Sequence, residues 1–235
     1  MGWTGDPVWL ADVLRAEGVK VVETPGWKDW GNGDFKNIWG VICHHTGGSN
    51  TPVSEIRNGT PNLRGLLSQI HLAKDGTATL CGVGVAWHAG MGSYPGLPED
   101  NANWHTIGIE AVNNGTEGWS PAQYDAYVRV CAAIVRRLGY GADRVIGHKE
   151  WAGRKQGKWD PGGIDMDAFR RDVQARLNPP KKTIGDIVSE GLNEVVKAMD
   201  GTEHKIKDLI RYTDGRVFEM SKKIDELLKL AKGGK

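Results

Sequence analysis

The stretch "GVICHHTGGSN", residues 40–50, places two adjacent histidines at the end of a β-branched apolar run and before a glycine-rich turn. The run predicts a buried strand, and the glycines predict a loop after it. In α/β proteins the loops at strand ends carry many functional side chains, because the sheet fixes the backbone while the loop leaves the side chain accessible. His44 and His45 are therefore the first candidate functional residues.

Segments on both sides of this stretch predict further strands. They are short and rich in β-branched residues, which favour extended backbone. Two of these runs are joined at a Lys-Asp-Gly turn, which predicts a hairpin. The strand-like segments are residues 19–23, 37–45, 106–112 and 144–147, and the predicted hairpin is residues 68–82.

Helices are predicted between these strands. A proline follows Asp6, so we expect Asp6 to cap a helix over residues 7–18. Ser120 caps a longer helix over residues 121–139, in which apolar residues recur every three to four positions. After His148 we expect a loop. This alternation predicts an α/β fold with a mixed central β-sheet flanked by helices.

The composition changes at "NPPKKT", residues 178–183. We interpret residues 178–183 as a linker between a domain of residues 1–177 and a helical tail of residues 184–235. Apolar residues and threonines recur in the tail at spacings of three and four, which predicts a coiled coil and a homo-oligomer joined through residues 184–231. Three glycines interrupt the pattern, so a hairpin of two shorter amphipathic helices is the alternative.

The overall composition excludes several classes of protein. The formal net charge of +1 gives no electrostatic basis for binding nucleic acid. No run approaches the about 18 apolar residues of a membrane span, so stable membrane insertion is not expected, and the N-terminus shows no export signal. Three widely spaced cysteines argue against a disulfide framework and favour synthesis in a reducing cytoplasm.

Three residues of the first domain together predict a metal site. His44 and His148 each end a predicted strand, and Asp160 follows in "KWDPGG". A catalytic zinc takes three protein ligands and keeps a fourth position open for water. Each residue alone is more often structural, but the three together predict a Zn2+ site. The stretch "HKEWA" lacks the second histidine of the HExxH zinc helix and the helical context.

Four blocks in order, "VICHHTGG", "SQIHLAKDGTATLCGVGVAWHAG", "TIGIEAVN" and "VIGHKEWAGRKQGKWDPG", resemble the zinc-dependent type-2 N-acetylmuramoyl-L-alanine amidases. Phage endolysins, bacterial recycling enzymes and animal peptidoglycan-recognition proteins share this family. The resemblance covers residues 37–177. It implies a type-2 amidase fold and a zinc enzyme that hydrolyses the amide between N-acetylmuramic acid and the L-alanine of the stem peptide.

The resemblance also implies a role for each candidate residue. A carboxylate moves the proton of the attacking water, and a lysine faces the oxyanion that forms. The implied metal ligands are His44, His148 and Asp160, the implied catalytic residues are Glu110 and Lys158, and the implied substrate-facing residues are His45, His71 and His88. The chain departs from the endolysin branch at Ile70, where a tyrosine is common, and at Asp160, where a cysteine is common.

These features favour a phage-type endolysin that acts on bacterial peptidoglycan. We expect it in the host bacterial cytoplasm before its release to the cell wall, with the tail serving assembly or wall binding. One alternative is a peptidoglycan-recognition module without activity, although such modules usually lack a zinc ligand. The other is a cytoplasmic muropeptide-recycling amidase, which the absence of an export signal fits equally and the tail argues against.

Overall fold

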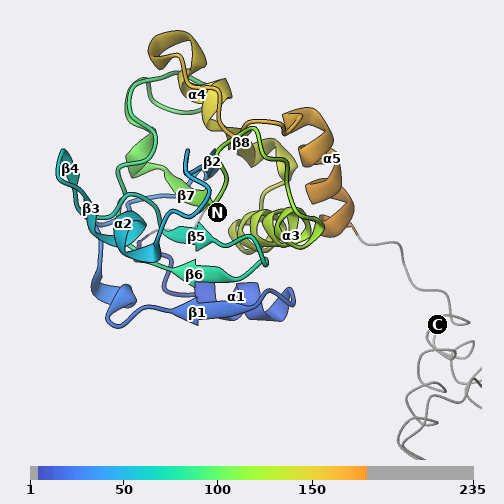
Figure 1. Cartoon of the computed structure of the whole chain (residues 1–235), viewed down its shortest axis with the longest axis horizontal. Coiled ribbons are helices and arrows are strands. Elements are labelled where there is room, and N and C mark those ends of the chain that lie inside the picture. The colour runs from blue at the N-terminus through green and yellow to red at the C-terminus, as the bar shows by residue number, and fades with distance from the viewer. Residues whose placement is uncertain (1–4, 179–235) are drawn as a thin grey trace, which may run out of the picture. The chain divides into compact units, whose positions relative to one another are not determined.

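A computed structural model of the chain describes residues 5–178 (Figure 1). The chain divides into two units, Met1–Pro179 and Pro180–Lys235, and the described residues belong to the first. The linker of residues 178–183, apart from its first residue, lies outside the described residues. The predicted helical tail, its coiled coil and its role in assembly lie there as well and stay predictions.

A six-stranded mixed sheet forms the centre of the described unit. Its strand order is β1-β6-β5-β7-β2-β8, and only the β5–β6 pair is antiparallel. The strands are β1 (Val21–Glu23), β2 (Gly40–His45), β5 (Ile70–Leu72), β6 (Ala78–Leu80), β7 (Thr106–Ala111) and β8 (Val145–Gly147). The expected α/β fold with a mixed sheet is therefore confirmed, and β5 and β6 form the expected hairpin.

Helices flank this sheet, and Figure 1 shows α3 and α5 next to each other beside it. The helices are α1 (Leu10–Ala16), α2 (Val53–Asn58), α3 (Pro121–Leu138), α4 (His148–Gln156) and α5 (Met166–Leu177). Short 3-10 helices lie at Trp27–Asp29, Ala102–Trp104 and Ala142–Arg144, and β3 (Gly59–Thr60) pairs with β4 (Leu63–Arg64). Within residues 5–178, no helix combines the length and the apolar character needed to cross a membrane.

The long helix α3 anchors the strand that carries His44. Its N-terminus has the predicted cap, because Ser120 Oγ accepts a hydrogen bond from the backbone N–H of Gln123 at 3.1 Å. The buried hydroxyl of Tyr127 donates to the backbone carbonyl of His44 at 2.9 Å. This hydrogen bond ties the C-terminal end of β2 to α3 and fixes the backbone at His44.

The first helix begins later than the sequence predicts. Asp6 does not cap it, because α1 starts at Leu10 and the carboxylate of Asp6 accepts a hydrogen bond from the backbone N–H of Phe35 at 2.8 Å. This tertiary partner competes with the local cap, so Asp6 ties the N-terminal segment to a loop instead.

The segment after His148 is a helix, α4, and the prediction of a loop was wrong. The carboxylate of Glu150 accepts from the backbone N–H of Gly147 at 2.8 Å and pairs with Arg170, which stabilises the helix N-terminus. Few α4 residues are buried, so the helix leaves almost no apolar periodicity in the sequence. His148 is consequently the first residue of a helix, which restricts its backbone more than a loop would.

Candidate metal centre

Two strand ends and one loop bring three ligand-type side chains together. His44 lies at the end of β2, and His148 follows β8, which pairs with β2 in parallel so that Cys43 lies opposite Gly147. In the loop after α4, Asp160 places Oδ2 3.0 Å from Nδ1 of His44 and 3.0 Å from Nδ1 of His148. The ligand atoms of this buried group lie within 4.8 Å of one another. This arrangement is suited to hold a metal ion.

The proton position on His148 fits a metal ligand. Its Nε2 lies 2.9 Å from the carbonyl oxygen of Ala89, which only accepts hydrogen bonds, so Nε2 carries the proton. In the neutral ring, Nδ1 then presents a lone pair to Asp160 Oδ2 at 3.0 Å. Two acceptors at this distance repel each other unless a cation or a proton lies between them. Imidazole nitrogens and carboxylate oxygens are also the ligands that catalytic zinc takes.

The protonation states of the other two side chains fit as well. Burial, together with the neighbouring His148, lowers the pKa of His44 to about 4, so this ring is neutral at pH 7. Burial alone would raise the pKa of Asp160, but the side chains of His148 and His44 outweigh it and hold the pKa below its ordinary value. The group therefore offers a neutral imidazole and a carboxylate, which are the forms that bind metal ions.

Glu110 lies beside this group on β7. It pairs in register with His44 of β2, and its Oε1 lies 4.0 Å from Nδ1 of His44. Its Oε2 is buried without a hydrogen-bond partner among the described residues. Burial and the nearby Asp160 raise the pKa of Glu110 to about 8, although the charge of Lys158 lowers it. Glu110 is therefore a carboxyl group that can gain or lose a proton near neutral pH.

His71 continues this row of polar side chains on β5, where it pairs in register with Glu110. Its Nε2 lies 2.9 Å from the carbonyl oxygen of Thr51, so Nε2 carries the proton. Its Nδ1 is buried without a hydrogen-bond partner in residues 5–178. The structure therefore places His71 next to Glu110 and outside the three-residue metal group.

Lys158 lines a pocket next to the metal group. The pocket has a volume of about 300 Å³, and His88 and His148 line it as well. The Lys158 side chain is exposed, and its positive charge lowers the pKa of both Glu110 and His44. Lys158 is thus a cation at the open side of the site.

His45 lies outside the metal group and supports the loop that carries Asp160. Its Nδ1 accepts a hydrogen bond from the backbone N–H of Gly162 at 2.9 Å, and its ring packs edge-on against Trp159. Trp159 is 52% exposed, although its indole leaves no space for a side chain at Gly115. Sequence motifs did not indicate a role for Trp159, although its position between Lys158 and Asp160 was a usable signal.

His88 is buried directly behind His44. Its Nδ1 lies 3.0 Å from Nε2 of His44, and its Nε2 lies 3.1 Å from the carbonyl oxygen of Thr106. Both ring nitrogens therefore have protein partners, and neither is free to bind a substrate. Asn103 Oδ1 accepts hydrogen bonds from the backbone N–H groups of His88 and Ala89, and no sequence motif indicated this role.

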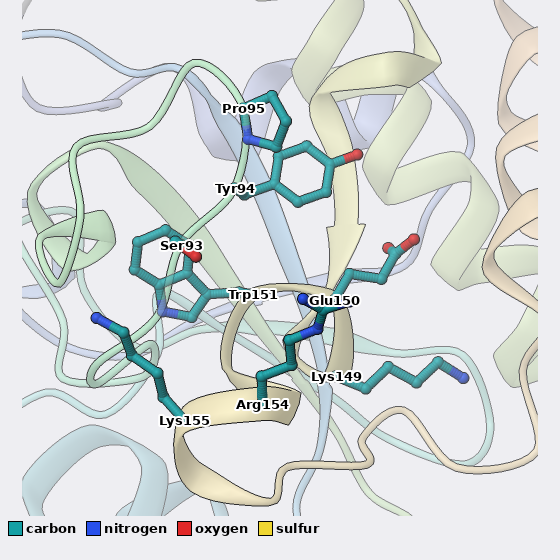
Figure 2. A pocket seen from close by; sticks show the side chains of 8 residues that line it. All are labelled: Ser93, Tyr94, Pro95, Lys149, Glu150, Trp151, Arg154 and Lys155. Carbon is teal, nitrogen blue, oxygen red and sulfur yellow. The ribbon is translucent and has the colours of Figure 1, made fainter.

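A second pocket of about 330 Å³ lies beside α4 and contains none of the candidate residues (Figure 2). Its lining residues are Ser93, Tyr94, Pro95, Lys149, Glu150, Trp151, Arg154 and Lys155. Several of its charged groups already have partners, because Glu150 pairs with Arg170 and Lys155 with Asp100. Figure 2 shows Lys149 and Lys155 pointing to opposite sides, so they do not converge on one ligand.

Comparisons with known proteins identify one family for this chain. The family model described as N-acetylmuramoyl-L-alanine amidase matches residues 34–163, which is more than half of the chain. The matched range contains every candidate residue of the metal group and its surroundings.

Individual relatives match either over a shorter segment of the chain or at lower sequence identity. A segment of 85 residues is 36% identical to the 1,6-anhydro-N-acetylmuramyl-L-alanine amidase AmpD of Enterobacter cloacae, and it covers 36% of this chain and 43% of that protein. The alignment therefore spans less than half of that relative. A crystal structure of a Se-Met AmpD derivative is 26% identical, with a TM-score of 0.50, and the match covers 66% of this chain and 94% of that one. The endolysin amidase LysCS from Clostridium intestinale URNW is 20% identical, with a TM-score of 0.47, over 68% of this chain and 95% of that one.

Proposed function

Because the chain belongs to the N-acetylmuramoyl-L-alanine amidase family, we propose that it hydrolyses the amide between N-acetylmuramic acid and the L-alanine of the peptidoglycan stem peptide. The observation that carries this proposal is the convergence of His44, His148 and Asp160 beside the buried carboxyl group of Glu110. A ligand group next to a proton-transfer group is what metal-assisted hydrolysis of an amide requires.

We assign the metal as Zn2+, held by His44, His148 and Asp160. When bound there, Zn2+ supplies a Lewis acid that activates water for attack on the amide carbonyl. With these three protein ligands, a bound Zn2+ would retain a further position for water or substrate, as in catalytic zinc sites. Neutral nitrogen ligands and one carboxylate keep a positive charge at the site, which favours this activation.

Glu110 and Lys158 supply the remaining chemistry. Glu110 takes the proton of the attacking water and passes it to the leaving amine of L-alanine, and a pKa near neutrality suits a group that must do both. Lys158 presents its ammonium group to the oxygen of the scissile amide as negative charge develops there. The pocket that Lys158 lines with His148 is the place for the scissile bond.

Two residues next to Glu110 and His44 are proposed to face the substrate. His71 lies beside Glu110 and retains an unpaired Nδ1, which can accept a hydrogen bond from the stem peptide or from water. His45 would act through Trp159, whose exposed indole meets the His45 ring edge-on.

Two cellular roles share this chemistry, and we propose the endolysin role. The predicted coiled coil of residues 184–231 supports it, since several tethered active sites raise the effective concentration on an insoluble wall. The second candidate is a recycling amidase that acts on soluble muropeptides. The name of the Enterobacter cloacae relative, which specifies 1,6-anhydro-N-acetylmuramyl-L-alanine, favours this second role.

Mass spectrometry of the products from purified peptidoglycan tests the proposal. The zinc-loaded full chain is expected to release stem peptides with a free L-alanine N-terminus, which neither a glycosidase nor an endopeptidase produces. Wall binding without such release would identify a recognition module instead. A parallel assay with soluble 1,6-anhydro-muropeptides separates the two roles, because a recycling amidase is expected to prefer them strongly over intact wall.

A further inference from the structure

We propose that His88 is a positioning residue that fixes the ring proton of His44 on Nε2, so that Nδ1 of His44 faces the metal group as a lone pair. The inference rests on the proposed function, because it concerns the metal ligands of that site. It assigns to His88 a role different from the substrate contact that the family resemblance implies.

The proton position on His88 follows from its partner at the back of the site. The carbonyl oxygen of Thr106 lies 3.1 Å from Nε2 of His88 and can only accept, so Nε2 carries a proton. The hydrogen-bond partners of this ring within residues 5–178 are that carbonyl oxygen and His44, so one proton on Nε2 satisfies the contact with Thr106. The Nδ1 atom of His88 therefore presents a lone pair.

This lone pair decides the tautomer of His44. Nδ1 of His88 lies 3.0 Å from Nε2 of His44, so Nε2 of His44 must donate and carries the proton. Nδ1 of His44 is then unprotonated and faces Asp160 at 3.0 Å. Without His88, the alternative tautomer would place the proton on Nδ1, where it would form a charge-assisted hydrogen bond to Asp160. That proton would occupy the ligand nitrogen that the metal needs.

The neighbouring residue does the same for the second histidine. The carbonyl oxygen of Ala89 accepts from Nε2 of His148 at 2.9 Å, so the dipeptide of residues 88 and 89 sets the proton on both rings. Asn103 holds this dipeptide, because its Oδ1 accepts the backbone N–H of His88 at 3.0 Å and that of Ala89 at 2.8 Å. The tautomers of His44 and His148 therefore both depend on residues 88 and 89, whose backbone Asn103 holds in place.

The sheet also leaves space for the His88 ring. A Cβ atom added at Gly108 of β7 would lie 2.8 Å from Cγ of His88 and 3.0 Å from Oγ of Ser68. Such a contact is too short for backbone and ring to coexist without a shift. A glycine at this position is therefore what allows His88 to reach His44.

Two variants and two measurements test the proposal. His88→Leu fills the same space but cannot accept a hydrogen bond, whereas His88→Gln keeps one acceptor for His44 and one donor for Thr106. Imidazole nitrogen shifts in the zinc-free protein report the tautomer of His44, and competition with a chromophoric chelator gives the zinc Kd. We expect the proton of His44 on Nε2 in the wild type and its loss from that position in His88→Leu, with zinc bound about 10- to 100-fold more weakly. His88→Gln is expected to recover most of this loss.

His105→Leu is the matched control, since His105 hydrogen-bonds Asn37 away from the metal group and its loss should change neither readout. A wild-type protein with the His44 proton on Nδ1 would overturn the proposal without any variant. An unchanged zinc Kd and tautomer in His88→Leu would overturn it too. If the wild type binds no zinc, the proposed function fails, while the tautomer of zinc-free His44 still decides this inference. Should His88→Leu fail to fold, Gly108→Ala displaces the ring instead and is expected to weaken zinc binding.

Discussion

The two sides of the site differ in how completely their buried polar atoms are paired. On the side of β2 and β8, the second ring nitrogen of His44 and that of His148 each have a hydrogen-bond partner. On the side of β7 and β5, Oε2 of Glu110 and Nδ1 of His71 are buried without one among the described residues. An unpaired buried polar atom lowers the free energy of unfolding by about 1–3 kcal/mol. The unpaired atoms on the side of β7 and β5 therefore reduce the stability of the fold.

This difference in pairing distinguishes the residues proposed to bind the metal from those proposed to exchange protons. A metal ligand needs a fixed ring and a fixed proton, and full pairing provides both. A group that exchanges protons with substrate and water needs an atom that the protein itself leaves free. We interpret the paired side as the metal holder and the unpaired side as the place where water and substrate complete the hydrogen bonds.

The largest effect is expected from removing a metal ligand on the side of β2 and β8. His44→Ala removes one of three ligands, so both stoichiometric zinc and wall hydrolysis should be lost. The fold should remain, because the sheet depends on the backbone of β2 rather than on this side chain. Elemental analysis, an activity assay and circular dichroism measure the three quantities. Full activity in a zinc-free His44→Ala protein would refute the metal assignment.

The next effect concerns the unpaired side. Glu110→Gln keeps the shape of the side chain but cannot take a proton, so turnover should fall by roughly two to four orders of magnitude. Zinc content should stay at the wild-type value, unlike in His44→Ala. Turnover within a few-fold of wild type would mean that another group moves the proton.

The same substitution is expected to stabilise the zinc-free protein at high pH. The pKa of Glu110 is raised from 4.5 to about 8, so the folded state holds this proton more tightly than the unfolded chain. Stability from this group is complete below pH 4.5 and is lost as the pH rises toward 8, by at most about 1.4 kcal/mol per pH unit.

Glutamine does not titrate, so the advantage of Glu110→Gln over wild type should grow by roughly 2–4 kcal/mol between about pH 5 and about pH 8. Urea unfolding of both proteins in the presence of a chelator measures it, and titrating groups that do not interact with Glu110 cancel in the difference. An equal difference in the free energy of unfolding at the two pH values would show that burial does not shift the pKa of Glu110.

The smallest effect is expected at His71. His71→Phe removes an unpaired nitrogen together with one hydrogen bond to Thr51, so the free energy of unfolding should change by less than about 1 kcal/mol. Turnover should fall less than tenfold, and zinc content should not change. A loss of turnover as large as in Glu110→Gln would instead make His71 a partner in proton transfer.

Sequence patterns predicted the elements whose signals are local. The β-branched run before His44 and the Ser120 cap of α3 both specify structure through neighbours along the chain. Helix α4 was missed because it is polar and buries few residues, and Asp6 was misassigned because its partner, Phe35, is distant in sequence.

The sequence indicated which three residues form the candidate metal group, but not how their side chains are oriented. The pairing of β2 with β7, which places His44 beside Glu110, was not predicted from the sequence. The role of His88 depends on the orientation of two rings and one carbonyl group, and the support from Asn103 depends on backbone N–H groups. No periodicity or motif spacing reports such directions, so only coordinates reveal them.

The separation of His44 from Asp160 by 116 positions along the chain has a kinetic consequence. Closing so long a loop is entropically unfavourable, so we expect the ligands to meet only after the sheet has formed. A metal ion that binds only after the ligands have met does not lower the barrier to folding. It must, however, dissociate before the protein unfolds. Zinc is therefore expected to slow unfolding, measured by stopped-flow fluorescence, while the refolding rate stays the same.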